Sequence, residues 1–222
     1  MSSLLLLNGS PRGTRSNSMK MLSRVGEGWV RGGGAEPEVL HLALERDRAR
    51  AAEAFGAADT VVLGMPLYAD SMPGLVMGFI ETLAPFVGRG ENPRLGFLVQ
   101  SGFPEALHSR PLERYLAKLA TRLGCEYAGT VVRPGGEVLQ VMPDRANKKL
   151  WESLRSVGAS LVVGAFDPVV LSRIAGKERL SPTMVRVMSL AEKAPVTEFY
   201  WNGLLKKNGA WDKRFDAPYA SA

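Results

Sequence analysis

The chain has 222 residues, of which 45% are hydrophobic and 23% charged, so it is long enough and apolar enough to bury a sizeable core. Its single cysteine excludes an intrachain disulfide and argues against a cysteine-ligated cluster, which favours a cytoplasmic location. Residues 167–222 hold 9 of the 28 basic and 6 of the 22 acidic side chains, so this part and residues 1–166 each carry a net charge of +3. The positive charge is therefore not concentrated in a basic arm of the kind that nucleic-acid binders use.

The first predicted strand is the run of four leucines at residues 4–7, which ends in a turn rich in glycine and hydroxyl side chains. The turn reads Asn8-Gly9-Ser10-Pro11-Arg12-Gly13-Thr14-Arg15-Ser16-Asn17-Ser18. Apolar residues then recur at helical spacing over residues 17–29, and three glycines at 32–34 end that helix. Because N–H groups at a helix start bind anions, this stretch predicts a site of phosphate size.

The rest of the first three-quarters of the chain alternates between strand and helix patterns. The predicted strands lie at 38–42, 60–64, 95–99 and 126–132. The predicted helices lie at 45–55, 74–83, around Leu112–Leu123 and at 147–163. This order predicts an α/β fold, in which one five-stranded parallel sheet is doubly wound and carries helices on both faces.

Three loops of unusual composition follow the first, third and fourth predicted strands. They span residues 9–18, 65–73 and 100–105. In a doubly wound sheet, ligands bind beyond the carboxyl ends of the strands, near the point where the strand order switches. We therefore expect these loops to form a ligand site together.

Residues 167–222 depart from the alternating pattern, so we divide the chain into a domain at 1–166 and a C-terminal helical or irregular extension. Ser181 followed by Pro182 predicts a helix start, since serine caps helices and proline suits their first position. The end of the chain is aromatic and basic without a clean period. Two placements stay open for the extension: folding back on its own domain, or docking on a partner subunit.

The composition of the first loop narrows the kind of phosphate that it could hold. A Walker loop needs Gly-Lys followed by Ser or Thr, and no lysine occurs before Lys20. The dinucleotide fingerprint needs three spaced glycines, and only Gly13 follows Gly9. The remaining groups suit a single terminal phosphate without a metal: Ser10, Arg12, Thr14, Ser16, Asn17 and Ser18. For Ser16 and Asn17 the alternative is helix capping, which is compatible with anion binding.

Other candidate residues favour structural roles. His41 closes a short strand. His108 follows the loop after the fourth strand and is interpreted as an exposed cap, with approach to a substrate as the alternative. Cys125 lacks a partner that would make it a nucleophile, and we interpret it as a small buried residue. The spacing of His, Asp and Glu does not predict a metal site. The start of the chain lacks the basic residues of a secretory signal, and no run approaches the length of a membrane span.

The first loop and the loop after the third strand together resemble the flavodoxin-like NAD(P)H-dependent FMN reductases. The motifs are Asn8-Gly9-Ser10-Pro11-Arg12 with Ser16-Asn17-Ser18, and then Pro66-Leu67-Tyr68-Ala69-Asp70-Ser71-Met72-Pro73. The resemblance covers residues 1 to about 165 and implies a flavodoxin-like fold. It also implies an FMN cofactor, NADH or NADPH as electron donor, and a homodimer or higher homo-oligomer.

The resemblance also implies roles for individual residues by position. The phosphate contacts would be Ser10, Arg12, Ser16, Asn17 and Ser18. The contacts to the isoalloxazine ring would be Pro66, Leu67, Tyr68 and Ala69, with Ser101, Gly102 and Phe103 near the ring edge. Independently of the resemblance, Leu67 and Tyr68 between two prolines give a stiff loop with apolar and aromatic surface, which suits a flavin. The alternative for Tyr68 is packing at a strand end.

Three functions stay open at this point. The first is an FMN-dependent oxidoreductase that passes electrons from NAD(P)H to a small acceptor such as a quinone, a nitroaromatic or free flavin. The flavin would carry the hydride, so the protein would need no catalytic acid or base of its own. The second is a flavodoxin-like electron carrier or FMN-binding protein without NAD(P)H activity. The third is a protein that keeps the fold and has lost the flavin.

Overall fold

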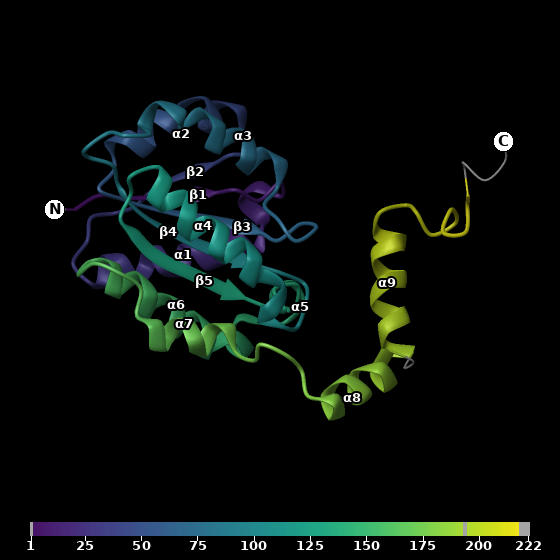
Figure 1. The fold of residues 1–222 in the computed structure, drawn as a ribbon. Helices are drawn as coiled ribbons and strands as arrows, with labels where there is room; N and C mark the ends of the chain where they lie inside the picture. Colours follow the sequence, from purple (N-terminus) through teal and green to yellow (C-terminus); the bar gives the residue numbers. More distant parts are fainter. Residues whose placement is uncertain (1, 193–194, 218–222) are drawn as a thin grey trace. The chain divides into compact units, whose positions relative to one another are not determined.

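A single parallel sheet of five strands organises the chain, and the computed structural model describes residues 2–192 and 195–217 of it. The strand order is β2-β1-β3-β4-β5 (Figure 1). The strands are β1 Leu4–Asn8, β2 Glu38–His41, β3 Thr60–Pro66, β4 Arg94–Gln100 and β5 Tyr127–Arg133. The predicted doubly wound five-stranded parallel sheet is therefore confirmed.

Helices cover both faces of the sheet (Figure 1). One face carries α1 Asn17–Arg31, α6 Lys148–Leu161 and α7 Pro168–Ala175. The other face carries α2 Glu45–Ala57, α3 Gly74–Thr82 and α4 Arg110–Arg122. The short elements are α5 Val138–Val141 and the 3-10 turns Gly13–Arg15, Ala84–Phe86, Ala106–Ser109 and Asp144–Asn147.

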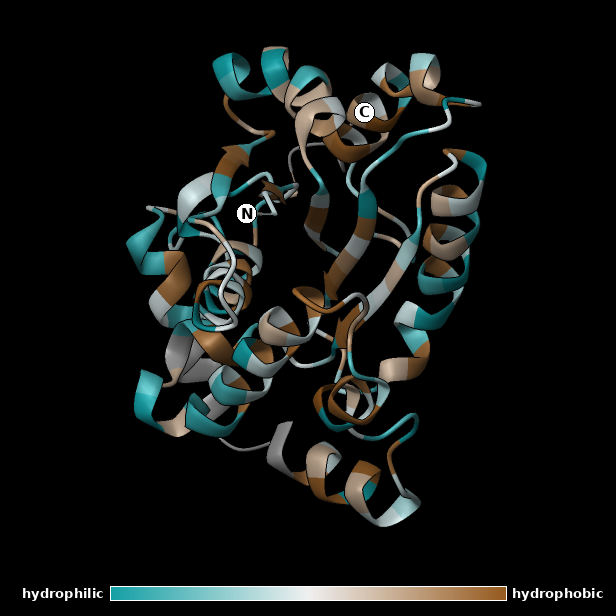
Figure 2. Cartoon of the chain, turned by 90° about the vertical axis from the view of Figure 1, so that its left-hand side faces the viewer, coloured by the Kyte–Doolittle hydropathy of each residue, from teal (hydrophilic) through white to brown (hydrophobic). Residues whose placement is uncertain are grey.

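The leucines of β1 supply both halves of the core. Leu5 and Leu7 pack into the cluster under α2, α3 and α4, whereas Leu4 and Leu6 pack into the cluster under α1 and α6. Successive side chains of a strand point to opposite faces, so a strand covered on both sides needs an unbroken apolar run. Figure 2 shows such hydrophobic stretches along the strands.

Two strands run further than predicted, and this shortens the loops that follow them. Met65 and Pro66 belong to β3 and Gln100 to β4, because the parallel pairing of these strands continues to the pair Pro66↔Gln100. The loop predicted to begin at residue 65 therefore begins at Leu67. Proline is tolerated at residue 66 because the pairing of β3 with β1 ends at Gly64, and the N–H that bonds to the end of β4 is that of Leu67.

The contacts divide the chain into two compact units, of which the first ends at Arg179 and the second begins at Leu180. The boundary proposed at residue 166 falls just before α7, and α7 packs against β5 and α6 within the first unit. The proline at its first position and the Asp167 side chain, which accepts the Val169 N–H at 2.8 Å, start this helix.

The second unit contains helices α8 Pro182–Glu192 and α9 Pro195–Lys207. Ser181 Oγ accepts the N–H of Met184 at 3.3 Å, which confirms the predicted helix start. Further along, Lys206 and Arg214 lie over the ring of Trp211. The side chains of residues 191–200 and all of residues 218–222 lie outside the described part, including Ala191 and Tyr219 of the predicted apolar and aromatic pattern.

No described helix is long and apolar enough to cross a membrane.

Two glycines allow α1 and α6 to touch backbone to backbone. A Cβ atom at Gly28 would overlap the carbonyl oxygen of Arg155, and one at Gly158 would overlap the carbonyl oxygen of Val25. Neither obstacle is a flexible side chain that could move away. This contact fixes the distance between the two helices, and with it the position of α1 above the sheet.

We predict that Gly158→Ala lowers the free energy of unfolding by about 1–3 kcal/mol, because the methyl group forces the helix backbones apart. Gly78→Ala is the matched control, since Gly78 lies in α3 and its added Cβ would meet no atom within 4 Å. It should be neutral or stabilise by up to about 1 kcal/mol. Urea unfolding of both variants checks this, and equal effects would contradict the contact.

Candidate functional site

The loops after β1, β3, β4 and β5 meet at the carboxyl edge of the sheet and are joined by hydrogen bonds. The Leu67 N–H donates to the carbonyl of Gln100 at 2.7 Å, which ties the loop after β3 to the end of β4. The Gly136 N–H donates to the carbonyl of Ser101 at 2.6 Å. Asn17 Nδ2 donates to the carbonyl of Gly136 at 2.8 Å, which ties the start of α1 to the loop after β5. The structure thus brings the three predicted loops together and adds a fourth.

Asn8 holds the first loop in shape from its buried position at the end of β1. Its side-chain Oδ1 accepts the N–H of Ser10 at 3.2 Å and the hydroxyl of Ser16 at 3.3 Å. Its Nδ2 donates to the carbonyl of Gly13 at 2.8 Å and lies 3.0 Å from Nδ1 of His41. The sequence motif includes Asn8, but no role was predicted for its side chain. Its position, as a polar residue that directly ends a buried strand, could have indicated one.

Ser16 begins α1, as the capping alternative predicted. Its hydroxyl accepts the N–H of Met19 at 3.1 Å, and its carbonyl accepts the N–H of Lys20 at 3.1 Å. The N–H groups of a first helical turn have no partner inside the helix, so those of Asn17 and Ser18 remain for a ligand or solvent. The hydroxyl of Ser18 is buried and has no hydrogen-bond partner among the described residues. This helix start therefore combines a cap with free donors.

The side chain of Asn17 is engaged by the fourth loop. Its Nδ2 donates to Gly136, while its Oδ1 is buried and has no partner among the described residues. The carbonyl oxygen cannot donate to an anion, so Asn17 can offer a phosphate its backbone N–H and the second hydrogen of Nδ2, while the first is held by Gly136. Sequence reasoning missed this cross-link because the two residues are 119 positions apart.

Arg12 lies beside the loop with its guanidinium half exposed. Nη1 is 3.5 Å from Oε1 of Glu137 in the fourth loop, and the two side chains are 52% and 48% exposed. An ion pair of this exposure contributes little, typically up to about 1 kcal/mol. Arg12 can therefore leave Glu137 for an anion in the first loop at small cost.

The loop after β3 forms a tight turn that presents Tyr68. The N–H of Tyr68 donates to the carbonyl of Ser71 at 2.8 Å, and the N–H of Ser71 donates back at 3.0 Å. The two central residues, Ala69 and Asp70, have φ values of 46° and 61°. Positive φ at both central residues is characteristic of a type I′ turn, in which Gly, Asn and Asp predominate, so Ala69 is the unusual occupant. Tyr68 is left 45% exposed at the carboxyl edge.

The residues predicted to contact a flavin ring differ in their exposure. Tyr68 and Ala69 are exposed, whereas Pro66 and Leu67 are buried, with Leu67 in the core below α3. In the loop after β4, Ser101 is buried and Gly102 is exposed. The surface available to a ligand is therefore formed by the turn residues and the exposed backbone.

Phe103 continues the aromatic surface of the loop after β4. Its ring is 49% exposed and stacks on the ring of His108, with centroids 4.3 Å apart. Nε2 of His108 is 3.4 Å from Oε2 of Glu105. The exposed capping role predicted for His108 is wrong, because the ring packs against Phe103 in a half-buried position.

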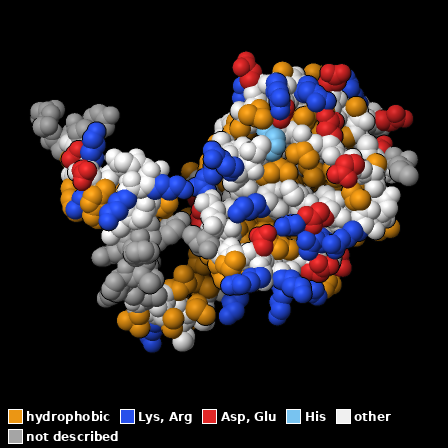
Figure 3. Space-filling model, turned by 180° about the vertical axis from the view of Figure 1, so that it is seen from behind, with side chains coloured by type: hydrophobic (Ala, Val, Ile, Leu, Met, Phe, Trp, Pro, Cys, Tyr) orange, Lys and Arg blue, Asp and Glu red, His pale blue; other side chains and the backbone are white. Residues whose placement is uncertain are grey.

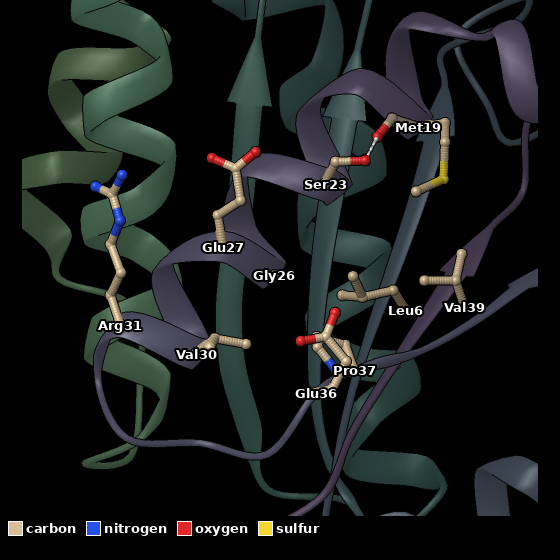
Figure 4. Close-up of a pocket in the computed structure, with 10 residues that line it drawn as sticks. All are labelled: Leu6, Met19, Ser23, Gly26, Glu27, Val30, Arg31, Glu36, Pro37 and Val39. Carbon is tan, nitrogen blue, oxygen red and sulfur yellow. Dashed lines mark hydrogen bonds between the residues drawn. The ribbon is translucent and has the colours of Figure 1, made fainter.

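Two grooves flank the sheet. One, of about 460 Å³, runs along α1 beside β2 and is lined by residues such as Met19, Val30 and Val39 (Figure 4). Figure 3, seen from behind, shows hydrophobic side chains gathered between charged ones. None of this groove's lining residues belongs to the predicted loops. The other, of about 420 Å³, opens beside the Tyr68 turn and is lined by Asp70, Ser71 and apolar side chains of α3 and α4.

The described part of the chain contains no cluster of three or more His, Cys, Asp and Glu side chains that could hold a metal ion. The groups that the loops offer at the carboxyl edge include backbone N–H groups, hydroxyl groups, the arginines of the first loop and the exposed rings of Tyr68 and Phe103.

Residues 2–148 match the sequence model of a family described by its flavodoxin-like fold. Among solved structures, an FMN-dependent NADH-azoreductase from Bacillus anthracis in complex with FMN is 15% identical, with a TM-score of 0.56 over 72% of this chain and 99% of its own. An NAD(P)H:quinone oxidoreductase from Methanothermobacter marburgensis is 16% identical, with a TM-score of 0.58 over 72% and 96%.

The apo form of an NADH:FMN oxidoreductase, EMOB, is 16% identical, with a TM-score of 0.56 over 83% of this chain and 99% of its own. No curated protein matches this sequence. Identities this low show that the fold is shared and nothing more.

We predict that the thiol of Cys125 is unreactive in the folded protein. Burial raises its pKa to about 11, so at about pH 8 roughly one thiol in a thousand is ionised, against about one in four for an ordinary cysteine. Alkylation by iodoacetamide should be at least about 100-fold slower in the native protein than in urea. Equal rates in both conditions would show that the thiol is not buried as described.

Proposed function

The chain belongs to the family with the flavodoxin-like fold, and we propose that it is an FMN-dependent oxidoreductase that takes electrons from NADH or NADPH. The electrons would pass to a small acceptor, such as a quinone, a nitroaromatic or free flavin. The observation that carries this proposal is the set of hydrogen bonds that joins four loops at the carboxyl edge. A helix start with free donors lies in one of these loops, and a rigid turn that presents Tyr68 lies in another.

The first loop fits the phosphate end of FMN. Free N–H groups at Asn17 and Ser18 lie at the positive end of the α1 dipole, where a dianion is favoured. The hydroxyl of Ser18 and the half-exposed guanidinium of Arg12 can add further donors. Ser10 and Ser16 complete the proposed set, with Ser16 also serving as the helix cap.

The loops after β3 and β4 fit the flat ring of FMN. Tyr68 and Phe103 expose aromatic surface, and Ala69 and Gly102 expose backbone next to it. Pro66 and Leu67 would support the ring contacts from below, since both are buried, and Ser101 would lie near the ring edge. The neighbouring groove of about 420 Å³ offers an apolar space of the size that small ligands occupy.

When bound, FMN supplies the hydride chemistry itself, and the protein's part is to bind and orient it. The side chains of this edge would therefore act through position and electrostatics. Backbone donors beside the ring favour the negative charge that a flavin gains on reduction. In the loops after β3 and β4 this part would fall to backbone N–H groups other than those of Leu67, Tyr68 and Ser71, which already donate within the protein.

We also propose that the protein is a homodimer or a higher homo-oligomer, with the C-terminal extension covering apolar surface of its own or a partner's domain. The extension exposes Met184, Val185, Val187 and Leu190 along α8. A helix of this length gains its stability by burying such a face.

We predict that the purified full chain binds FMN and that NADH or NADPH bleaches the visible flavin absorption rapidly in the absence of oxygen. A protein that stays colourless with added FMN would contradict the proposal. Bound FMN that only a protein donor reduces would instead identify an electron carrier. Titration with each nicotinamide separately gives the donor preference.

We predict that Arg12→Ala weakens FMN binding about 10- to 100-fold, because a hydrogen bond to a charged group contributes about 1.5–3 kcal/mol. Riboflavin, which lacks the phosphate, should bind the variant and the original chain equally. Arg122→Ala is the matched control, since Arg122 lies in the last turn of α4, at the opposite edge of the sheet. Fluorescence titration with both flavins measures this. A similar loss for riboflavin would place Arg12 away from the phosphate.

A further inference from the structure

The orientation of the Asn8 amide is determined by two neighbours that each have a single hydrogen-bonding role. The carbonyl of Gly13 can only accept, so the atom facing it must be Nδ2. The N–H of Ser10 can only donate, so the atom facing it must be Oδ1. Exchanging the two ends of the amide would break both bonds.

This orientation fixes the protonation of His41. Nδ1 of its ring lies 3.0 Å from Nδ2 of Asn8, which carries hydrogens and no lone pair for this bond. Nδ1 must therefore accept and carry no proton. The imidazole is neutral, with its proton on Nε2.

His41 is held beside Asn8 by the sheet and by α2. The two residues are partners in the parallel register of β1 and β2. The N–H of His41 donates to Oδ2 of Asp47 at 2.9 Å, and the N–H of Leu42 donates to the carbonyl of Asn8 at 3.0 Å. With the bond to His41, all four hydrogen-bonding positions of the Asn8 side chain are used.

We propose that His41 is a positioning residue for the first loop, and that protonation of its ring releases the loop and weakens anion binding. A protonated Nδ1 would present a hydrogen to the hydrogens of Asn8 Nδ2, so the bond would be lost. Asn8 then loses the anchor that holds its amide toward Gly13 and Ser16. The proposal rests on the proposed function only in taking the FMN phosphate as the anion.

The charged side chains beside His41 come from α2 and already have partners. Nη1 of Arg48 donates to the carbonyl of Leu42 at 3.4 Å, and a guanidinium cannot accept a bond from the ring. From α2, the nearby carboxylate is that of Asp47, which accepts the His41 backbone N–H and pairs with Nε of Arg46 at 3.2 Å. From β1 and the turn at Gly13–Arg15, the groups at this junction are the neutral Asn8 side chain and the carbonyl of Gly13. Among the described residues, no ion pair involves the ring of His41.

Charge alone would give the opposite effect, which makes the proposal testable. An added positive charge near a phosphate site strengthens binding through simple Coulomb attraction. Loss of the Asn8 bond weakens it. The direction of the change as pH falls therefore separates an electrostatic role of His41 from a positioning role.

The test is FMN affinity of the full chain at about pH 8 and about pH 5, which bracket the usual range of histidine titration. We expect binding about tenfold weaker at the lower pH, the effect of one lost hydrogen bond. In His41→Gln, the side-chain carbonyl can accept from Asn8 and does not titrate. The FMN affinity of this variant should therefore match that of the original chain at about pH 8 and should not weaken through this residue at about pH 5. His41→Leu should bind weakly at both.

Riboflavin, which lacks the phosphate, provides the control. An effect of pH on the ring contacts should appear with riboflavin as well as with FMN, whereas an effect of His41 on the first loop should appear with FMN alone. Titration of the FMN phosphate itself is common to all variants, so it cancels when His41→Gln is compared with the original chain. If His41→Gln keeps the pH profile of the original chain, or if binding by the original chain tightens as the pH falls, His41 does not position the loop.

Nitrogen NMR of the full chain tests the inference without flavin. We expect the Nε2–H tautomer of His41 at about pH 8, and the side-chain amide signal of Asn8 should shift as the His41 ring titrates. A ring that titrates while the signals of Asn8 and Gly13 stay fixed would overturn the proposal. If FMN binds at neither pH, the proposed function is overturned, and the NMR measurement alone decides whether His41 positions the first loop.

Discussion

A primary amide buried without hydrogen bonds costs several kcal/mol, and the carboxyl edge of this sheet is built around one that is fully satisfied. Asn8 is placed there because the four leucines before it must fill both layers of the core, which leaves no freedom in the register of β1. Its four partners come from the first loop, from α1 and from β2. The shape of the loop thus follows from how the strand is buried.

The helix that offers its N-terminus to the loop is positioned by a separate constraint. Gly28 and Gly158 let the backbones of α1 and α6 meet, so the axis of α1 is fixed by hard contact and not by adaptable side chains. The direction of the helix dipole is fixed with it. A binding feature at one end of α1 therefore depends on packing near its other end.

Much of this fold can be predicted from short stretches of the sequence. The leucine run, the glycines after α1 and the serine at residue 181 each act over a few residues, and the elements they predict are present. The meeting of the loops followed from the rule that parallel strands end at one edge. The bond from Asn17 to Gly136 did not, because it joins segments that no local pattern relates. The left-handed backbone at Ala69 was also unpredictable, since alanine gives no signal for it.

The turn at Tyr68 has a thermodynamic consequence for any ligand that rests on it. Holding Ala69 at positive φ costs of order 1–3 kcal/mol, whereas the aspartate at residue 70 tolerates this conformation better, and the fold meets this cost whether or not a ligand is present. A flat molecule that binds against Tyr68 therefore does not lose affinity by ordering a loose segment. A turn that is already closed by two hydrogen bonds also favours ligands that match its shape over ligands that would need it to change.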